Sequence, residues 1–334
     1  MSNRKNAPFD RIVFEKGNRR DGFIDVATTP TGAYVSIPVI EISGSEEGPL
    51  LLVDSCTHGD EYEGSVAVIR AAKQLESMDF KGTFIGIPAL NMDAYSANTR
   101  SSTVDLTNLN RIYPGDTNKF ITQRVAAKYF EKLVGIADYI ISFHGGGTAL
   151  HLEPIAGYIA PNDELMLITR EMAKAFGTDY IWRLRNLPFT GTASSEIAKL
   201  GIPLILPEVG SHCGRLYDWE KNVDICELGV INTMKHIGML YGEPCCNDED
   251  SASNSDPIDI ELQYIHTNDG GRHHRLVNPN DTVKKGDILA QIEDVFGNVI
   301  SEIIAIDDSI VIGFCSNPVI KPGEWSFLMG KIIS

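Results

Sequence analysis

The first two thirds of the chain alternates short apolar runs with segments whose apolar residues recur at helical spacing. The apolar runs are short enough for buried strands, and the periodic segments between them are long enough for helices. Strands are expected at 49–56, 83–90, 137–146 and 202–210, and helices at 64–77, 120–134, 162–177 and 219–242. Strands that alternate with helices predict an α/β fold with a mixed, mostly parallel sheet covered by helices.

The pattern changes near residue 245. Residues 245–259 are small, polar and acidic without periodicity, which is typical of a linker. Beyond them, short apolar segments are divided by turn signals and predict β-strands only. We therefore expect a main domain at 1–245 that carries the chemistry, a linker at 246–258 and a β-rich domain at 259–334.

Composition and charge narrow the class of protein. The 334 residues have a hydrophobic fraction of 43% and a net charge of −16, and a field of that sign repels phosphate backbones and anionic membranes. The sequence has no apolar signal region near its N-terminus and no apolar run long enough to cross a bilayer. Its six cysteines have no framework-like spacing. We expect a cytoplasmic protein with reduced thiols that binds neither nucleic acid nor membranes.

Polar side chains cluster directly after four of the predicted strands, where α/β proteins usually place their functional groups. These residues are His58 to Glu61 after the first strand, Asn91 with Arg100 and 108–111 after the second, His144 after the third and Glu208 at the end of the fourth. The carboxyl ends of neighbouring parallel strands lie at one edge of a sheet, so we expect these groups to converge.

His58 and Glu61 are spaced so that both can bind one metal ion from a tight loop. A helix-capping loop with solvated carboxylates has the same pattern, and His144 alone is equally compatible with a hydrogen-bonded core residue. Together the two histidines and the carboxylate match an open catalytic zinc site, which keeps one coordination position for water.

Glu208 ends an otherwise apolar strand, where a carboxylate is costly unless it is paired, exposed in a cleft or close to a metal. It is either a salt-bridge partner of an arginine or a general base beside a metal-bound water. Arg100 and Arg111 are either solvated loop charges or groups that stabilise an oxyanion and bind a carboxylate through a bidentate contact.

Five motifs occur in a fixed order along the chain. They are His58 with 59–64, Pro88–Asn91, Asn108–Arg111 before 113–115, His144-Gly145-Gly146, and Pro207–Gly210. With these motifs the chain resembles the aspartoacylase/succinylglutamate desuccinylase family of the zinc carboxypeptidase-like superfamily, over nearly its whole length. Within the family it most resembles the branch that contains N-α-acetyl-L-2,4-diaminobutyrate deacetylase.

The resemblance implies one Zn²⁺ per chain, with His58, Glu61 and His144 as its ligands. It implies Glu208 as the catalytic base and Arg100 at the scissile carbonyl. The expected reaction is hydrolysis of the amide bond of a small N-acyl amino acid, as in a deacetylase that acts on an N-acetyl-diaminobutyrate-like substrate. A metallocarboxypeptidase acting on short peptides and a metal-free binding protein on the same scaffold are the alternatives.

The resemblance also implies substrate-binding roles for Asn91, Asn110 and Arg111, the last two at the substrate carboxylate. The chain departs from its relatives at two points. Many of them have Asp two residues before the second histidine ligand, where this chain has Ser142, and the usual Asp-Leu-Asn-Arg begins here with Asn108. With Ser142 at this position, the sequence leaves open which residue supports the metal ligands from the protein interior.

The β-rich C-terminal part is expected to narrow the mouth of the active site. Arg272, His273 and His274 either lie near the cleft or form a solvent-facing basic turn. Glu153 could select a cationic side chain, but we expect it to be a surface acid. The identity of the acyl group and amine, and whether the chain forms a homo-oligomer, stay open.

Overall fold

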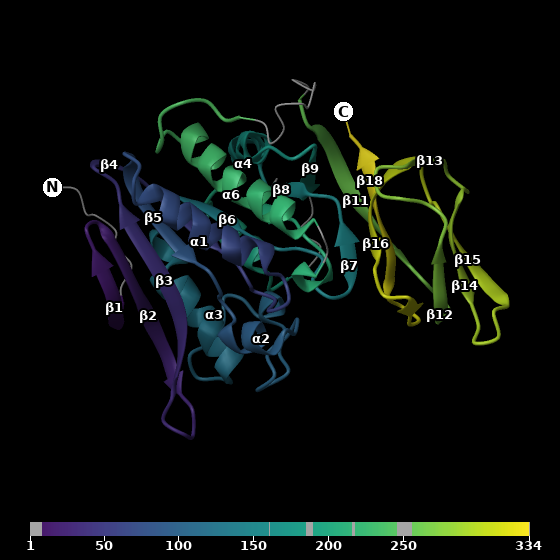
Figure 1. Ribbon diagram of the computed structural model, residues 1–334, viewed down its shortest axis with the longest axis horizontal. Helices are drawn as coiled ribbons and strands as arrows, with labels where there is room; N and C mark the ends of the chain where they lie inside the picture. The colour runs from purple at the N-terminus through teal and green to yellow at the C-terminus, as the bar shows by residue number, and fades with distance from the viewer. Residues whose placement is uncertain (1–8, 160, 185–189, 216–217, 246–255, 334) are drawn as a thin grey trace.

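A computed structural model of the protein describes residues 9–159, 161–184, 190–215, 218–245 and 256–333. Most of the expected linker, residues 246–255, therefore lies outside the described residues. Figure 1 shows helices packed on a large twisted sheet, with the C-terminal strands gathered at one end of the molecule.

The large sheet contains 14 strands within the described part of the chain. In spatial order they are β1 (Arg11–Lys16), β2 (Arg19–Thr28), β3 (Tyr34–Ser43), β5 (Lys81–Ile87), β4 (Glu46–Asp54), β6 (Tyr139–Ser142), β10 (Leu204–Glu208), β8 (Ile155–Ile159), β9 (Tyr180–Leu184), β11 (Ile258–His266), β18 (Trp325–Ile332), β16 (Ser309–Cys315) and β13 (Thr282–Val283), with β7 (Leu150–Leu152) paired to β16. Strands β5, β4, β6 and β10 are parallel to one another, and β8 returns antiparallel to β10. The expected α/β fold with a mixed sheet is confirmed, with parallel pairing in its central strands and antiparallel pairing in the strands at both ends.

Helices cover both faces of the central strands. α1 (Glu63–Leu75), α4 (Asp163–Phe176) and α6 (Trp219–His236) share one hydrophobic core with the sheet, and α3 (Ile121–Lys132) and α5 (Ala193–Lys199) share the other. Alternate residues of β4 enter the two cores, Leu51 and Val53 the first, and Leu50 and Leu52 the second. The unbroken apolar run of this strand is thus explained by burial on both sides.

The helix predictions agree closely with the structure, with one correction. The predicted Asn cap of α4 is present, because the Asn162 side chain accepts a hydrogen bond of 2.9 Å from Leu165 N. The predicted helix 219–242 instead ends at His236, and Gly238 adopts a left-handed φ of 76° that a continuing helix does not allow. The short helix α2 (Met92–Ala97) and the 3₁₀ turns η1 (Leu109–Arg111), η2 (Val134–Ile136) and η3 (His212–Gly214) complete this part.

The C-terminal strands do not stand apart from the main sheet. β11 pairs with β9 through Ile258 and Ile260, so the large sheet continues into the C-terminal region. A second sheet is formed by β15 (Val299–Ile304), β14 (Ile288–Glu293), β12 (Gly271–Arg275) and β17 (Val319–Ile320). Among the described helices, none combines the length and the apolar character needed to cross a membrane.

Candidate active site

The loop between β4 and α1 holds His58 and Glu61 at the carboxyl end of β4. Both side chains are buried, and the Cys56 thiol donates a hydrogen bond of 3.1 Å to Glu61 O within this loop. Gly59 lies so close to α2 that a Cβ at this position would be 1.9 Å from the carbonyl carbon of Ala94. The loop therefore needs glycine here to keep its path between α1 and α2.

His144 lies two residues after the end of β6 and beside the end of β10. The His144 N–H donates to Pro207 O at 2.9 Å, and Val209 N donates back to His144 O at 3.0 Å. These bonds form a parallel bridge between His144 and Glu208. Paired residues on neighbouring strands face the same side of a sheet, so both side chains project from one face.

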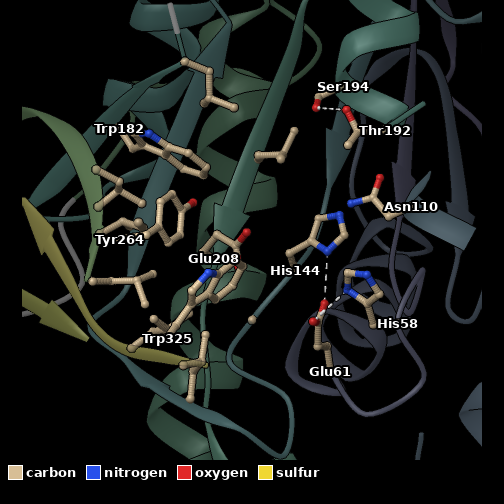
Figure 2. Close-up of a pocket in the computed structure, with 18 of the residues that line it drawn as sticks. His58, Glu61, Asn110, His144, Trp182, Thr192, Ser194, Glu208, Tyr264 and Trp325 are labelled. Atoms are coloured by element: carbon tan, nitrogen blue, oxygen red, sulfur yellow. Dashed lines mark hydrogen bonds and ion pairs between the residues drawn. The ribbon is translucent and has the colours of Figure 1, made fainter. Parts of the chain in front are cut away.

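Three buried side chains form a group with the composition of a metal site. His58, Glu61 and His144 each offer a ligand atom, and these atoms lie within 4.8 Å of one another. The Glu61 carboxylate lies between the histidines, 2.8 Å from His58 Nδ1 and 3.0 Å from His144 Nδ1 (Figure 2). Two imidazoles and one carboxylate are the ligands that an open catalytic zinc site uses.

Burial and mutual contacts together set the charge states of these three side chains. The pKa of His144 is raised, because its contacts with Glu61 outweigh the opposing effect of desolvation. Desolvation lowers the pKa of His58 to about 4, which keeps its imidazole neutral near pH 7. The pKa of Glu61 is lowered because its contacts with His58 and His144 outweigh the cost of burying its charge. His58 and Glu61 therefore have the charge states that bind a divalent metal, a neutral imidazole and an ionised carboxylate.

Glu208 is the next carboxylate along the same face. Burial raises its pKa to about 7; the negative charge of Glu61 acts in the same direction, while His144 and Arg100 oppose it. A carboxyl group with a pKa near neutrality can accept and return a proton at physiological pH. The environment of Glu208 thus suits a general base.

Arg100 and Arg111 reach the site from the segment after α2. Arg100 Nη1 lies 3.2 Å from Glu61 Oε1. The pKa of Arg111 is lowered by desolvation and by the nearby positive charge of Arg100. Two guanidinium groups that repel each other form a favourable site for an anion. Asn110 lies beside them and is held by a hydrogen bond of 3.0 Å from Ala193 N to its Oδ1.

Asn91 has a different environment from the other candidate residues. Its Oδ1 caps α2 by accepting a hydrogen bond from Ala94 N at 3.3 Å, and its Nδ2 donates to Thr57 O at 3.4 Å. It does not belong to the lining of the cavity described below. Its predicted substrate contact stays a prediction, while its contacts connect α2 to the loop of His58.

Behind His144, Ser142 has a buried acidic partner that the sequence did not reveal. The Ser142 hydroxyl donates a hydrogen bond of 2.9 Å to Asp54 Oδ1, and the Tyr129 hydroxyl donates one of 2.7 Å to Asp54 Oδ2. Asp54 and Ser142 are directly paired on β4 and β6. A buried carboxylate is thus present behind the metal group, but on the neighbouring strand.

One open cavity, of about 830 Å³ when the solvent-filled space at its mouth is included, contains these groups (Figure 2). Its lining includes seven of the eight predicted site residues: His58, Glu61, Arg100, Asn110, Arg111, His144 and Glu208. Sequence reasoning missed Thr192, Ser194 and a set of apolar side chains. Trp182 of β9 also lines the cavity, whereas Glu153, which was expected to be a surface acid, does not.

The C-terminal region contributes to this cavity through residues other than those considered from sequence. Leu262 and Tyr264 of β11 and Trp325 and Leu328 of β18 line it. Arg272, His273 and His274 do not. Arg272 forms an ion pair with Glu293, and His273 Nε2 lies 2.9 Å from the Ser326 hydroxyl.

With this geometry in place, the comparisons with known proteins define the class. Residues 47–237 match the succinylglutamate desuccinylase/aspartoacylase catalytic domain, and the chain belongs to this family. The resemblance to the diaminobutyrate branch is also confirmed. A curated relative, the N-alpha-acetyl-L-2,4-diaminobutyric acid deacetylase of Halomonas elongata, is 30% identical over 85% of this chain and 82% of its own length.

Solved structures of the family share the fold. A succinylglutamate desuccinylase from a Silicibacter species has a TM-score of 0.86 and 25% identity, covering 98% of this chain and all of its own. The product-bound ectoine utilization protein of Ruegeria pomeroyi has a TM-score of 0.85 and 24% identity, covering 96% of this chain and 98% of its own.

Proposed function

We propose that the protein is a zinc-dependent hydrolase that cleaves the amide bond of a small N-acyl amino acid, with Glu208 as the general base. The proposal is supported most directly by one observation. A buried His–Glu–His group and a carboxyl group with a pKa near 7 line the same cavity. The deacetylase relative agrees with a reaction at an acylated amine.

The residues of the group fit a zinc ion. Its two Nδ1 atoms and its carboxylate face one another, and all three side chains are buried, so the ligands are already arranged and desolvated. We assign them to one Zn²⁺ per chain. A bound zinc ion would lower the pKa of water towards about 7 and polarise the scissile carbonyl.

Glu208 performs the proton transfers in this proposal. It accepts a proton from the attacking water and returns it to the departing amine nitrogen, and a pKa of about 7 allows both steps near neutral pH. Arg100, whose guanidinium lies beside Glu61, donates hydrogen bonds to the carbonyl oxygen as negative charge develops on it.

Arg111 and Asn110 bind the carboxylate of the substrate. The pKa of Arg111 is lowered by desolvation and by the neighbouring Arg100, and a carboxylate that binds both guanidinium groups relieves their mutual repulsion. The hydrogen bond from Ala193 N holds Asn110 at the same edge of the cavity. This arrangement favours substrates with a free carboxylate near the scissile amide.

The general-base role is tested by Glu208→Gln in the zinc-loaded enzyme. The variant should keep one zinc per chain and lose at least about 100-fold in kcat, a size typical of general-base removal. Glu153→Gln, which changes a carboxylate outside the cavity, serves as the matched control and should keep wild-type turnover. Wild-type turnover in metal-replete Glu208→Gln would refute the role.

A further inference from the structure

The cavity has an apolar wall that the proposed chemistry does not use. Five strands that are adjacent in the large sheet, β10, β8, β9, β11 and β18, contribute to it. The wall consists of Leu206, Ile155, Trp182, Leu184, Leu262, Tyr264, Leu328 and Trp325. Figure 2 shows Trp182, Tyr264 and Trp325 on the opposite side of Glu208 from the two histidines.

The register of the strands places the start of this wall beside the reacting groups. Ile155 is paired with Glu208 across β8 and β10, and Leu206 precedes Glu208 by two residues, so all three project from one face. Gly157, two residues after Ile155, is paired with Trp182, so Trp182 on β9 projects from the same face of the sheet. The wall therefore begins at the proposed general base and leads away from the metal group.

The same register continues to the far end of the wall. Trp182 is paired with Ile260 on β11, so Leu262 and Tyr264, two and four residues further on, project from the same face. Tyr264 is paired with Leu328 on β18, and its ring lies 4.7 Å from that of Trp325. Both Trp182 and Trp325 are only partly buried, which leaves aromatic surface for a ligand.

The charges of the cavity argue against a cationic group at this wall. The carboxylates among the described lining residues are Glu61 and Glu208, and both already have tasks in the proposed reaction. Apart from the histidines, the other charged side chains of the lining are those of Arg100 and Arg111. An ammonium group placed against the wall would have only the aromatic ring faces as partners, and the two arginines of the lining would repel it, so an apolar group fits the wall better.

We propose that the substrate carries a hydrophobic group, aromatic or branched aliphatic, that packs against this wall during hydrolysis. The inference rests on the proposed deacylase function and adds a substrate class to it. The hydrophobic group belongs either to the amino-acid side chain or to the acyl group, since both extend from the scissile amide. Filling such a pocket should increase kcat/KM by roughly 10- to 100-fold over a substrate that leaves it empty.

A substrate panel with the zinc-loaded wild-type enzyme tests the proposal. One arm compares N-acetyl-L-phenylalanine with N-acetylglycine and N-acetyl-L-2,4-diaminobutyrate, and the other compares N-benzoyl-L-alanine with N-acetyl-L-alanine. We expect an advantage of at least about 10-fold in kcat/KM for the aromatic member of one arm. The arm that shows it identifies the group that occupies the wall. Equal rates in both arms, or a preference for the diaminobutyrate substrate, would overturn the proposal.

Binding separates a failure of this inference from a failure of the proposed function. Two of the three tryptophans, Trp182 and Trp325, belong to the wall, so fluorescence reports ligands there without turnover. If no N-acyl amino acid is hydrolysed but the aromatic ligands bind at least about 10-fold more tightly than N-acetylglycine, the proposed function is wrong and the hydrophobic binding site is supported. If the aromatic ligands bind no better than N-acetylglycine, the proposal that the wall binds a hydrophobic group of the substrate is wrong.

A matched pair of variants tests the charge argument. Leu262→Glu places a carboxylate in the middle of the wall, and Leu262→Gln has nearly the same size without the charge. Leu262→Glu should shift the ratio of kcat/KM values towards the diaminobutyrate substrate by at least about 10-fold, while Leu262→Gln should not. Equal ratios in the two variants would count against the proposal, and thermal melts confirm that both are folded.

Discussion

Asp54 and Ser142 are joined by a hydrogen bond of 2.9 Å across the paired strands β4 and β6, directly behind His144. Tyr129 of α3 donates a second hydrogen bond to the same carboxylate. The resemblance to this family leads one to expect an aspartate at the position of Ser142. The acidic group is present here on the adjacent strand, and the two hydroxyl donors hold β4, β6 and α3 together beneath the candidate site.

Asp54 should make stability depend on pH. Burial raises its pKa to about 6 from an ordinary 3.8, so between these values the folded protein keeps a proton that the unfolded chain has released. The stabilisation is complete below pH 4 and is lost as the pH rises through 6. Over this window the free energy of unfolding should fall by about 3 kcal/mol more in the wild type than in Asp54→Asn.

Urea unfolding of both proteins between pH 4 and 7 measures this difference. Asp93→Asn is a control of opposite sign. Burial alone would raise the pKa of Asp93, but hydrogen bonds from Ser102, Thr103 and Val104 lower it, so it stabilises the fold as the pH rises. Parallel stability curves for wild type and Asp54→Asn would show that Asp54 does not titrate in this range.

Removing the metal should abolish activity reversibly. Chelation should remove one equivalent of zinc per chain and lower the melting temperature, because an ion that binds only the folded state stabilises it by mass action. Zinc should restore both properties. His144→Ala should fail to bind zinc, whereas His274→Ala, which changes a histidine outside the cavity, should bind it normally. Full activity in a metal-free sample would contradict the prediction.

Arg111→Lys should raise KM by about 10- to 100-fold with a smaller change in kcat. Lysine keeps the positive charge but loses the planar pair of donors that binds a carboxylate at two points. A loss confined to KM indicates binding that is equal in the ground state and the transition state. Arg183→Lys, at an arginine paired with Glu261 outside the cavity, is the control. An unchanged KM in Arg111→Lys would remove this residue from the carboxylate site.

Gly59→Ala should disturb the backbone of the loop that carries His58 and Glu61. The added methyl group would overlap the Ala94 carbonyl, so the loop or α2 must shift. We expect a loss of about 1–3 kcal/mol in unfolding free energy, typical of overpacking, together with weaker zinc binding. Gly135→Ala, whose added methyl would lie 3.6 Å from its nearest neighbour, should be close to wild type. Normal zinc affinity in Gly59→Ala would show that the loop tolerates the shift.

The sequence by itself determined the α/β class, the main helices and the convergence of His58, Glu61, His144 and Glu208. These features follow from local rules. Burial on both faces gives β4 its continuous apolar run, and parallel strands that end at one edge bring their following residues together. Each signal, an apolar run followed closely by a polar group, lies within a few residues along the chain, so pattern alone reveals it. The resemblance of the ordered motifs to the family then joins the separate signals into one expected site.

The antiparallel return of β8, the link between Asp54 and Ser142 and the apolar wall were decided only by the tertiary structure. Each depends on which strands become neighbours in the sheet, and strand order is set by packing between segments far apart in sequence. Tyr264 shows this most clearly, because nothing in the local sequence of β11 distinguishes it from an ordinary aromatic residue of a strand. Only the pairing of β11 with β9 and β18 places it in the cavity with Glu208.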